Sequence, residues 1–344
     1  MGKIDFSVSE THTVLAPNWI GDTAMAAPFF ASLRSNFPDS KIRVIVNPWV
    51  EGLVQNYPWV DEIIKLDKKS FWYLLKTFRF GKLKNKLSSD TFWLLPNSFR
   101  SALIGYLSSS KSRIGYSARF RKQLLTNPVF LSENKSQYLI DYYLELLVAN
   151  GLNPVSKRIS IEIRDDLLEV SKNTLEKLVD LSQGPLIGIH PGAFFGSSKT
   201  WKPKNFGLLA ERLIDRENAN VLIFGGPGEK ELTEMVVKHS KAKALNFFGK
   251  DNLLILPGLL SMLDAFISGD TGPLHIASLV GTPTISIFGP TDPKLTAPRG
   301  SNNFYVYQNL DCSPCFKRVC PLHHHDCMEK ITVLDVENKL KNIL

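Results

Sequence analysis

The segment AFISGDTGPLHIASLVGTPTISIF, residues 265–288, is the most informative about the fold, because it contains a strand, a turn, a helix and a second strand in direct succession. Residues 265–268 are short and apolar, as a buried strand should be. Pro273 begins a run with apolar residues at helical spacing, and residues 284–288 are a second strand candidate. This succession is typical of parallel sheets that are covered by helices.

The turn at Asp270, Thr271 and Gly272 joins the first of these strands to the helix. Backbone N–H groups at a helix start have no partners within the helix and lie at the positive end of its dipole, so they favour an anion. The turn is therefore a candidate phosphate site. The alternative interpretation is an ordinary helix start, in which Asp270 or Thr271 is only the N-cap.

The same alternation extends along the chain. Amphipathic helical segments are expected at 23–36, 135–149, 204–217, 229–239 and 252–260. Strands are expected between them at 13–16, 42–46, 62–66, 91–95, 186–190 and 221–224. The pattern is interrupted over about 151–184 and then resumes. We therefore predict an α/β fold of two Rossmann-like domains, which bind ligands at the carboxyl ends of their strands.

The length of 344 residues and the hydrophobic content of 44% are sufficient for two domains with full cores. The first residues contain no apolar signal core, and no stretch reaches 18 uninterrupted apolar residues. Secretion and membrane spanning are therefore not expected, and the predicted location is the cytoplasm.

Positive charge is concentrated in the first half of the chain. The net charge is +8, and residues 1–150 hold 19 Lys and Arg against 12 Asp and Glu. Between Lys68 and Ser132 there are 13 basic residues and one acid, Asp90, with aromatic residues interleaved over 71–87. Such a surface suits nucleic acid, an anionic membrane or a polyanionic substrate, and the alternative is a solvated basic helix face.

Three further strand ends carry candidate chemistry. Asp22, in NWIGDTAMAAP (18–28), suits a general base, although an N-cap is the commoner role. Lys199, in HPGAFFGSSKTWKP (190–203), is a candidate phosphate partner within a flexible polar loop of Gly192, Gly196, Ser197 and Ser198. Glu229, in FGGPGEKE (224–231), can accept hydrogen bonds from a ribose.

Several common nucleotide motifs are absent. The sequence contains neither G-x-G-x-x-G nor the P-loop pattern, which disfavours a dinucleotide oxidoreductase or a nucleotide triphosphatase. It also contains no D-x-D, the acidic motif that would indicate a metal-bound diphosphate. If a nucleotide diphosphate binds, Lys199 and the amides of 271–273 must neutralise it, so no metal and no cofactor are expected.

Six segments in order carry a resemblance to a known family: GDTAMAAPFFASLRSNFP, PNSFRSALIGYL with SRIGYSARFRKQLL, HPGAFFGSSKTW, FGGPGEKE, GDTGPLHIASLVGTPTISIFGPTDP and CSPCFKRVCPLHHHDCM. They resemble the ADP-heptose:lipopolysaccharide heptosyltransferases of glycosyltransferase family 9, and within it the heptosyltransferase II type. The resemblance implies a glycosyltransferase B fold. It also implies an acceptor domain over 1–175, a nucleotide-sugar donor domain over 176–334, and a last helix over 335–344 that returns to the first domain.

The resemblance further implies inverting, metal-independent transfer of heptose from ADP-heptose to the inner-core heptose of lipopolysaccharide, carried on Kdo-lipid A. Asp22 is the expected general base, and Lys199 the expected diphosphate contact in both catalysis and donor binding. The remaining expected donor contacts are Gly192, Ser197, Ser198, Glu229 for the ribose, and Asp270, Thr271, Gly272 and His275. For His275 the alternative is a buried core histidine.

The basic region then has an expected partner, the anionic head of the acceptor. Arg100, Arg113, Arg119, Arg121 and Lys122 are the expected contacts, while 71–87 is expected to rest on the anionic cytoplasmic face of the inner membrane. No nucleic acid is expected, because no recognition motif accompanies the charge. The alternatives are a family 9 enzyme with another donor or acceptor, of the heptosyltransferase I type, and a non-catalytic module that binds nucleotide or anionic lipid.

All four cysteines lie in CSPCFKRVCPLHHHDC (312–327), beside three histidines. Zinc is one interpretation, although the spacing is not that of a standard finger. Reduced cysteines that pack a compact loop are the favoured interpretation in a reducing cytoplasm.

Overall fold

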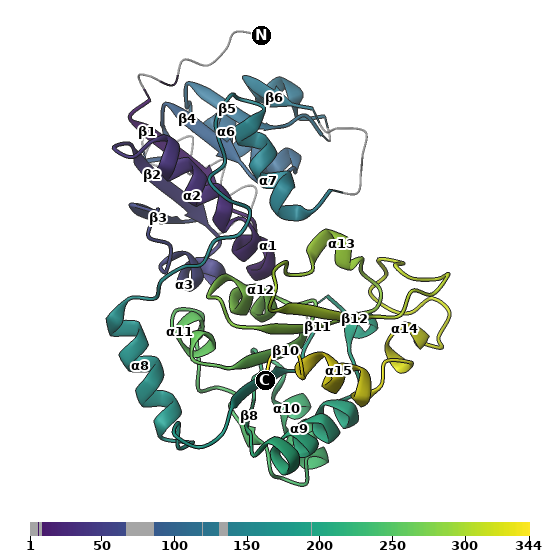
Figure 1. The fold of residues 1–344 in the computed structure, drawn as a ribbon. Coiled ribbons are helices and arrows are strands. Elements are labelled where there is room, and N and C mark those ends of the chain that lie inside the picture. Colours follow the sequence, from purple (N-terminus) through teal and green to yellow (C-terminus); the bar gives the residue numbers. More distant parts are fainter. Residues whose placement is uncertain (1–5, 7–8, 67–85, 119, 131–136, 194) are drawn as a thin grey trace. The chain divides into compact units, whose positions relative to one another are not determined.

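The computed structural model of the chain describes residues 6, 9–66, 86–118, 120–130, 137–193 and 195–344 (Figure 1). The chain divides into two compact units, residues 1–159 and 160–344. Each unit contains one sheet of six parallel strands with helices packed on it. The prediction of an α/β fold with two Rossmann-like domains is confirmed. The roles of acceptor domain over 1–175 and donor domain over 176–334 stay predictions.

The sheet of the first unit has the strand order β3-β2-β1-β4-β5-β6. From β1 the chain adds β2 and β3 on one side of the sheet, and it then crosses to the other side of β1 to form β4. β1 and β4 therefore flank the switch point, where such folds bind ligands. The strands are β1 Thr11–Leu15, β2 Lys41–Val46, β3 Glu62–Lys65, β4 Thr91–Leu94, β5 Ser112–Tyr116 and β6 Asn127–Val129. The described helices are α1 Ile20–Met25, α2 Ala27–Asn36, η1 Pro48–Val50, α3 Glu51–Val54, α6 Phe99–Leu107, η2 Lys122–Leu124 and α7 Leu139–Val148.

The sheet of the second unit repeats this topology, with the order β12-β11-β10-β7-β8-β9. Its switch point lies between β7 and β10, where His190 pairs with Ser268. The strands are β7 Leu186–His190, β8 Asn220–Ile223, β9 Leu245–Asn246, β10 Ala265–Gly269, β11 Thr284–Phe288 and β12 Asn303–Tyr307. The helices are α8 Asp165–Glu176, η3 Ser197–Lys199, α9 Pro203–Glu217, α10 Lys230–His239, α11 Leu256–Ser261, α12 Gly272–Leu279, α13 Pro293–Thr296, α14 Asp326–Glu329 and α15 Val333–Leu340.

The central strands of the second sheet are buried along their whole length. Every residue of β7, β10 and β11 is buried, because helices cover both faces of a parallel sheet. The last helix, α15, begins with a capping box between Thr332 and Asp335 and packs on α9, β11 and β12. The expected return of 335–344 to the first domain stays a prediction.

The interruption that the sequence shows over 151–184 contains a helix. α8 is amphipathic and packs on α11 of the second unit, where Gly258 lies against Ser171 and the Leu167 carbonyl. A Cβ at residue 258 would overlap the Ser171 hydroxyl, so glycine permits this close approach.

His12 is a fully buried histidine within β1. Its ring lies 4.1 Å from the ring of Phe37 between centroids, and Trp93 Nε1 donates to His12 Nδ1 at 3.4 Å. Burial lowers the pKa of His12 to about 4, since the desolvation outweighs the opposing charge of Asp90. The native first unit therefore contains a histidine that must stay neutral.

Acid should destabilise the protein through His12. Its pKa in the folded state lies below the ordinary 6.5, so the unfolded chain binds the extra proton and stability falls as the pH drops from about 6.5 towards 4. Between pH 8 and pH 5 the wild type should lose about 2 kcal/mol more than His12→Gln, which keeps an acceptor for Trp93. Urea unfolding of both proteins at the two pH values measures this difference.

The matched control is His239→Gln, because His239 is an exposed histidine at the end of α10. This control should keep the acid sensitivity of the wild type. An equal loss of stability in the wild type and His12→Gln would contradict the prediction.

Candidate functional site

The carboxyl edge of the second sheet brings together most of the residues that the sequence singled out. β7 ends at His190 and leads into the loop that carries Gly192 and Lys199, while β10 leads into Asp270. Glu229 follows β8 and is the N-cap residue of α10. Because β7 pairs with both β8 and β10, these residues lie around one switch point.

Lys199 and Asp270 form a buried ion pair. Lys199 Nζ lies 2.5 Å from Asp270 Oδ2 and donates to the Asp270 carbonyl oxygen at 3.1 Å. The two side chains are only 11% and 7% exposed. Burial alone would raise the pKa of Asp270, but the hydrogen bond with His275 and the charge of Lys199 hold that pKa well below its ordinary value. Asp270 is therefore ionised and fixes the ammonium group of Lys199.

His275 and Thr291 complete this network around Asp270. His275 Nε2, on α12, lies 3.3 Å from Asp270 Oδ1, and the Thr291 hydroxyl donates to Oδ2 at 2.9 Å. His275 is thus buried and also partnered with a residue of the candidate site. Thr291 was missed by the sequence analysis, although it follows β11 within the quoted segment GPTDP and so lies at a strand end.

The start of α12 is not closed by a side chain. Thr271 is the N-cap residue, but in the described structure its side chain makes no capping hydrogen bond, and its hydroxyl lies 2.8 Å from that of Ser268. Of the two alternative N-cap residues, Asp270 is excluded, since its carboxylate is engaged with Lys199, whereas Thr271 holds the N-cap position without a capping side-chain hydrogen bond. The first-turn N–H groups of α12, which begins at Gly272, keep their affinity for an anion.

The loop before Lys199 is anchored by the cysteine-rich segment 312–327. The N–H of Ser198 donates to the Arg318 carbonyl at 3.1 Å, and its hydroxyl donates to the Lys317 carbonyl at 2.6 Å. The Ser198 carbonyl in turn accepts from His325 Nε2 at 2.7 Å. The hydroxyl of Ser198 is thus committed to protein contacts, whereas Ser197 is exposed.

Gly196 is required where this loop meets the cysteine-rich segment. Its φ is 152°, and a Cβ there would overlap the carbonyl of Arg318. The close contact between the Lys199 loop and the cysteine-rich segment therefore requires a glycine three residues before Lys199.

Glu229 forms a second network with His190. Glu229 Oε2 lies 3.2 Å from His190 Nε2 and accepts from the Gly226 N–H at 2.6 Å. Burial would raise the pKa of Glu229, but these hydrogen bonds bring it below its ordinary value, so the carboxylate is charged. Gly192 lies so close that a Cβ would overlap this carboxylate. His190 was missed as a site residue, although its place as the last residue of β7 was the available signal.

In the first unit, Asp22 lies in the first turn of α1, directly after β1. The N-cap residue of α1 is Trp19, so the alternative role of Asp22 as N-cap is wrong. Burial raises the pKa of Tyr143, on α7, and the negative charge of Asp22 raises it further. Asp22 therefore lies near Tyr143. Arg100 lies in the first turn of α6, which follows β4, and β4 pairs with β1. Asp22 and Arg100 therefore follow the two strands that flank the first switch point.

The other expected acceptor contacts have different surroundings. Arg121 is fully buried and donates to the carbonyls of Tyr116 at 2.7 Å and Pro96 at 2.6 Å, which argues against direct contact with an acceptor. Arg113 donates to the carbonyls of Leu124 and Ser110 at 2.9 and 2.8 Å. Lys122 is exposed, with Nζ 5.4 Å from the ring centroid of Phe130. Arg119 and most of 71–87 lie outside the described residues.

The four cysteines are free thiols. Burial and then the three other thiols raise the pKa of Cys327 to about 11, so this side chain is protonated at neutral pH. Among the described residues, no group of three or more His, Cys, Asp and Glu side chains is arranged to hold a metal ion.

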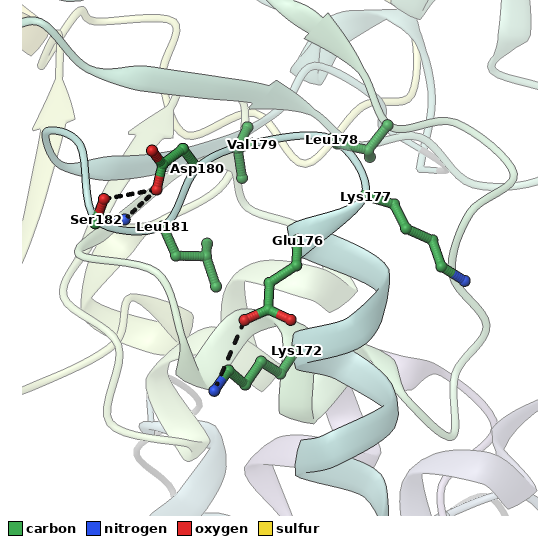
Figure 2. Close-up of a pocket in the computed structure, with 8 residues that line it drawn as sticks. All are labelled: Lys172, Glu176, Lys177, Leu178, Val179, Asp180, Leu181 and Ser182. Carbon is green, nitrogen blue, oxygen red and sulfur yellow. Dashed lines mark hydrogen bonds and ion pairs between the residues drawn. The ribbon is translucent and has the colours of Figure 1, made fainter.

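A hollow lined by residues at the end of α8 and in the following turn contains the Lys172–Glu176 ion pair and the Asp180–Ser182 hydrogen bonds (Figure 2). That turn leads into the amino end of β7, away from the carboxyl edge. No described helix combines the length and the apolar character that crossing a membrane requires.

Residues 80–325 match the model of glycosyltransferase family 9 (heptosyltransferase). The chain is 30% identical over 300 residues to lipooligosaccharide heptosyltransferase 2 of Haemophilus influenzae, which covers 83% of this chain and 85% of that protein. It is 28% identical over 335 residues to the protein of that name from Campylobacter jejuni, with 95% and 96% covered.

Solved structures share the fold. Escherichia coli ADP-heptose lipopolysaccharide heptosyltransferase II superposes with a TM-score of 0.81 at 22% identity, covering 97% of this chain and 98% of that chain. A family 9 glycosyltransferase from Veillonella parvula superposes with a TM-score of 0.85 at 20% identity, covering 99% and 98%. The fold is thus that of the glycosyltransferase B enzymes, as the resemblance implied. Because the family model spans more than half of the chain, this protein belongs to glycosyltransferase family 9, the heptosyltransferases.

Proposed function

We propose that this enzyme transfers heptose from ADP-heptose to the inner-core heptose of lipopolysaccharide, with inversion at the anomeric carbon and without a metal. The observation that carries the proposal is the buried network of Lys199, Asp270 and His275 beside the uncapped start of α12. In a family 9 chain, this pairing of a fixed cation with free helix N–H groups fits a leaving diphosphate. The relatives named heptosyltransferase 2 support the choice of sugar and acceptor.

The donor would lie along the carboxyl edge of the second sheet. Lys199 and the N–H groups of Thr271 and Gly272 would bind the diphosphate, with Gly192, Ser197 and Ser198 shaping the loop beside it. The ionised carboxylate of Glu229, held by His190 and Gly226, would accept hydrogen bonds from the ribose. No cofactor takes part in this scheme, because the lysine and the amides supply the electrophilic stabilisation.

Asp22 would act as the general base. Its carboxylate takes the proton of the acceptor hydroxyl while that oxygen forms a bond to the anomeric carbon. The bond from the anomeric carbon to the diphosphate oxygen breaks on the opposite face, and its electron pair leaves with ADP. One displacement from the opposite face inverts the anomeric centre.

The acceptor would be Kdo-lipid A that bears a heptose, approached at the cytoplasmic face of the inner membrane. The support is the excess of positive charge in residues 1–150 and the place of Arg100 beyond β4, beside the strand that leads to Asp22. Arg100 and Lys122 would contact the anionic head; Arg119, the other expected contact, lies outside the described residues. Arg113 and Arg121 would instead hold the loops that position these contacts.

The proposal predicts a specific product. ADP-heptose incubated with the enzyme should add one heptose to a Kdo-lipid A acceptor that already bears a heptose, and none to the heptose-free acceptor. Addition of EDTA should leave the yield unchanged. Mass spectrometry of the lipid product measures the transfer. Transfer to the heptose-free acceptor would indicate the heptosyltransferase I type, and absence of transfer to either acceptor would contradict the proposal.

Replacement of Asp22 tests the general base. Asp22→Ala should lower kcat roughly 10²- to 10⁴-fold and leave the Kd for ADP nearly unchanged, because the base acts on the acceptor and not on the nucleotide. The control is Asp39→Ala, since Asp39 is an exposed acid before the amino end of β2 and should not affect turnover. Full turnover in Asp22→Ala would show that another group removes the proton.

Replacement of Lys199 tests the diphosphate contact. Lys199→Ala should raise the Kd for ADP at least about tenfold, because a charge-assisted hydrogen bond in a buried site is lost. Lys204→Ala, an exposed lysine in the first turn of α9, is the control and should bind ADP as the wild type does. Calorimetric titration with ADP measures both, and equal affinities would refute the role of Lys199.

A further inference from the structure

We propose that Arg318, in the cysteine-rich segment, is a second cationic ligand of the donor diphosphate beside Lys199. The inference deepens the proposed function and rests on it, because it adds a residue to the site that would bind ADP-heptose. It assigns the segment around Arg318 a direct part in donor binding, in addition to its packing role.

The first reason is the charge already present in the site. The ammonium of Lys199 is offset by the carboxylate of Asp270, which lies 2.5 Å away and is buried with it. A doubly ionised diphosphate that enters this site meets a lysine whose charge is largely compensated, and also the partial positive charge of α12. A further cation would balance the negative charge of the diphosphate. Among the described residues, Arg318 lies beside the loop that carries Lys199.

The second reason is the position of the Arg318 guanidinium. Its central carbon lies 5.7 Å from the ring centroid of Phe195, and Lys199 Nζ lies 4.9 Å from the centroid of that same ring. The two cations therefore lie around one phenyl group, which belongs to the loop between β7 and α9. Arg318 is exposed, and in the described part of the chain it forms no ion pair with a carboxylate, so its charge is available to a ligand.

The third reason is that the backbone holds Arg318 in register with the loop that carries Lys199. The Arg318 carbonyl accepts from the Ser198 N–H at 3.1 Å, and Gly196 packs against the same carbonyl. A planar guanidinium presents paired N–H donors that match phosphate oxygens. Arg318 is thus a donor-binding residue, anchored by main-chain contacts that a side-chain substitution leaves in place.

The neighbouring Lys317 provides a matched control. Its carbonyl accepts from the Ser198 hydroxyl at 2.6 Å, and its side chain is also exposed and cationic. Lys317→Ala therefore removes one positive charge from the same segment without removing the group that lies over Phe195.

Calorimetric titration with ADP and with adenosine tests the inference. Arg318→Ala should raise the Kd for ADP about tenfold or more and leave the Kd for adenosine unchanged, because only the phosphates lose a partner. Arg318→Lys should lie between the wild type and Arg318→Ala, since it keeps the charge and loses the paired donors. Lys317→Ala should stay within about twofold of the wild type for both ligands.

The other outcomes each overturn the inference. Equal ADP affinities of Arg318→Ala and Lys317→Ala would show that Arg318 does not contact the diphosphate. Equal losses for ADP and adenosine in Arg318→Ala would assign it a purely structural role, which thermal unfolding of the variant would reveal as a lowered Tm. If the wild type itself bound no ADP, the proposed function would fail first and the inference with it.

Discussion

The candidate site at the carboxyl edge of the second sheet depends on one buried ion pair, that between Lys199 and Asp270. Removing two charges from water is costly, and their attraction compensates only when the geometry is good and the remaining lone pairs are satisfied. Here His275 and Thr291 satisfy the carboxylate from two further elements, α12 and the loop after β11. The pair can therefore form only when η3, β10, β11 and α12 are all in place. Asp270 acts as a positioning residue, because it directs the ammonium that is proposed to bind the donor.

A second constraint fixes the other side of this pair. The loop that carries Lys199 is attached to the cysteine-rich segment through both the N–H and the hydroxyl of Ser198. That segment is tied to the core through Cys327 and Met328, which are buried and lie against Gly289 at the end of β11. The position of Lys199, the candidate phosphate contact, therefore depends on how the cysteine-rich segment packs. The compact cysteine-rich loop thus has a packing role, in addition to the donor contact proposed for Arg318.

Sequence patterns predicted the fold well where the strands are buried on both faces. The bounds of β7 and β11 are those expected, because both are short isoleucine-containing runs that proline and glycine bound on each side. β5, β6, β9 and β12 were not predicted. β5 begins with two polar, partly buried residues, β6 contains a proline, β9 has only two residues, and β12 is only partly buried. α8 escaped notice because its charged residues mask an amphipathic pattern. The position of a candidate residue at a strand end was predictable, whereas its partner was not: the contacts of Asp270 with His275 and Thr291 exist only in three dimensions.

For the basic residues, too, the sequence predicted a region better than it predicted the individual contacts. The family resemblance and the basic composition together made Arg121 an expected contact of the acceptor, yet the structure buries it, because its guanidinium satisfies carbonyl groups of the turn after β4. The sequence alone does not distinguish an arginine that donates to backbone carbonyls from one that binds a phosphate. Charge counting therefore indicates the sign of a ligand and not which side chains reach it.

The most direct test of the central claim is a double-mutant cycle for ADP affinity with Lys199→Ala, Asp270→Ala and the double variant, measured by calorimetry. If Asp270 acts by positioning Lys199, the two substitutions should be coupled by more than about 1 kcal/mol. If their effects add to within about 0.5 kcal/mol, the two residues act independently, and the account of this site is contradicted.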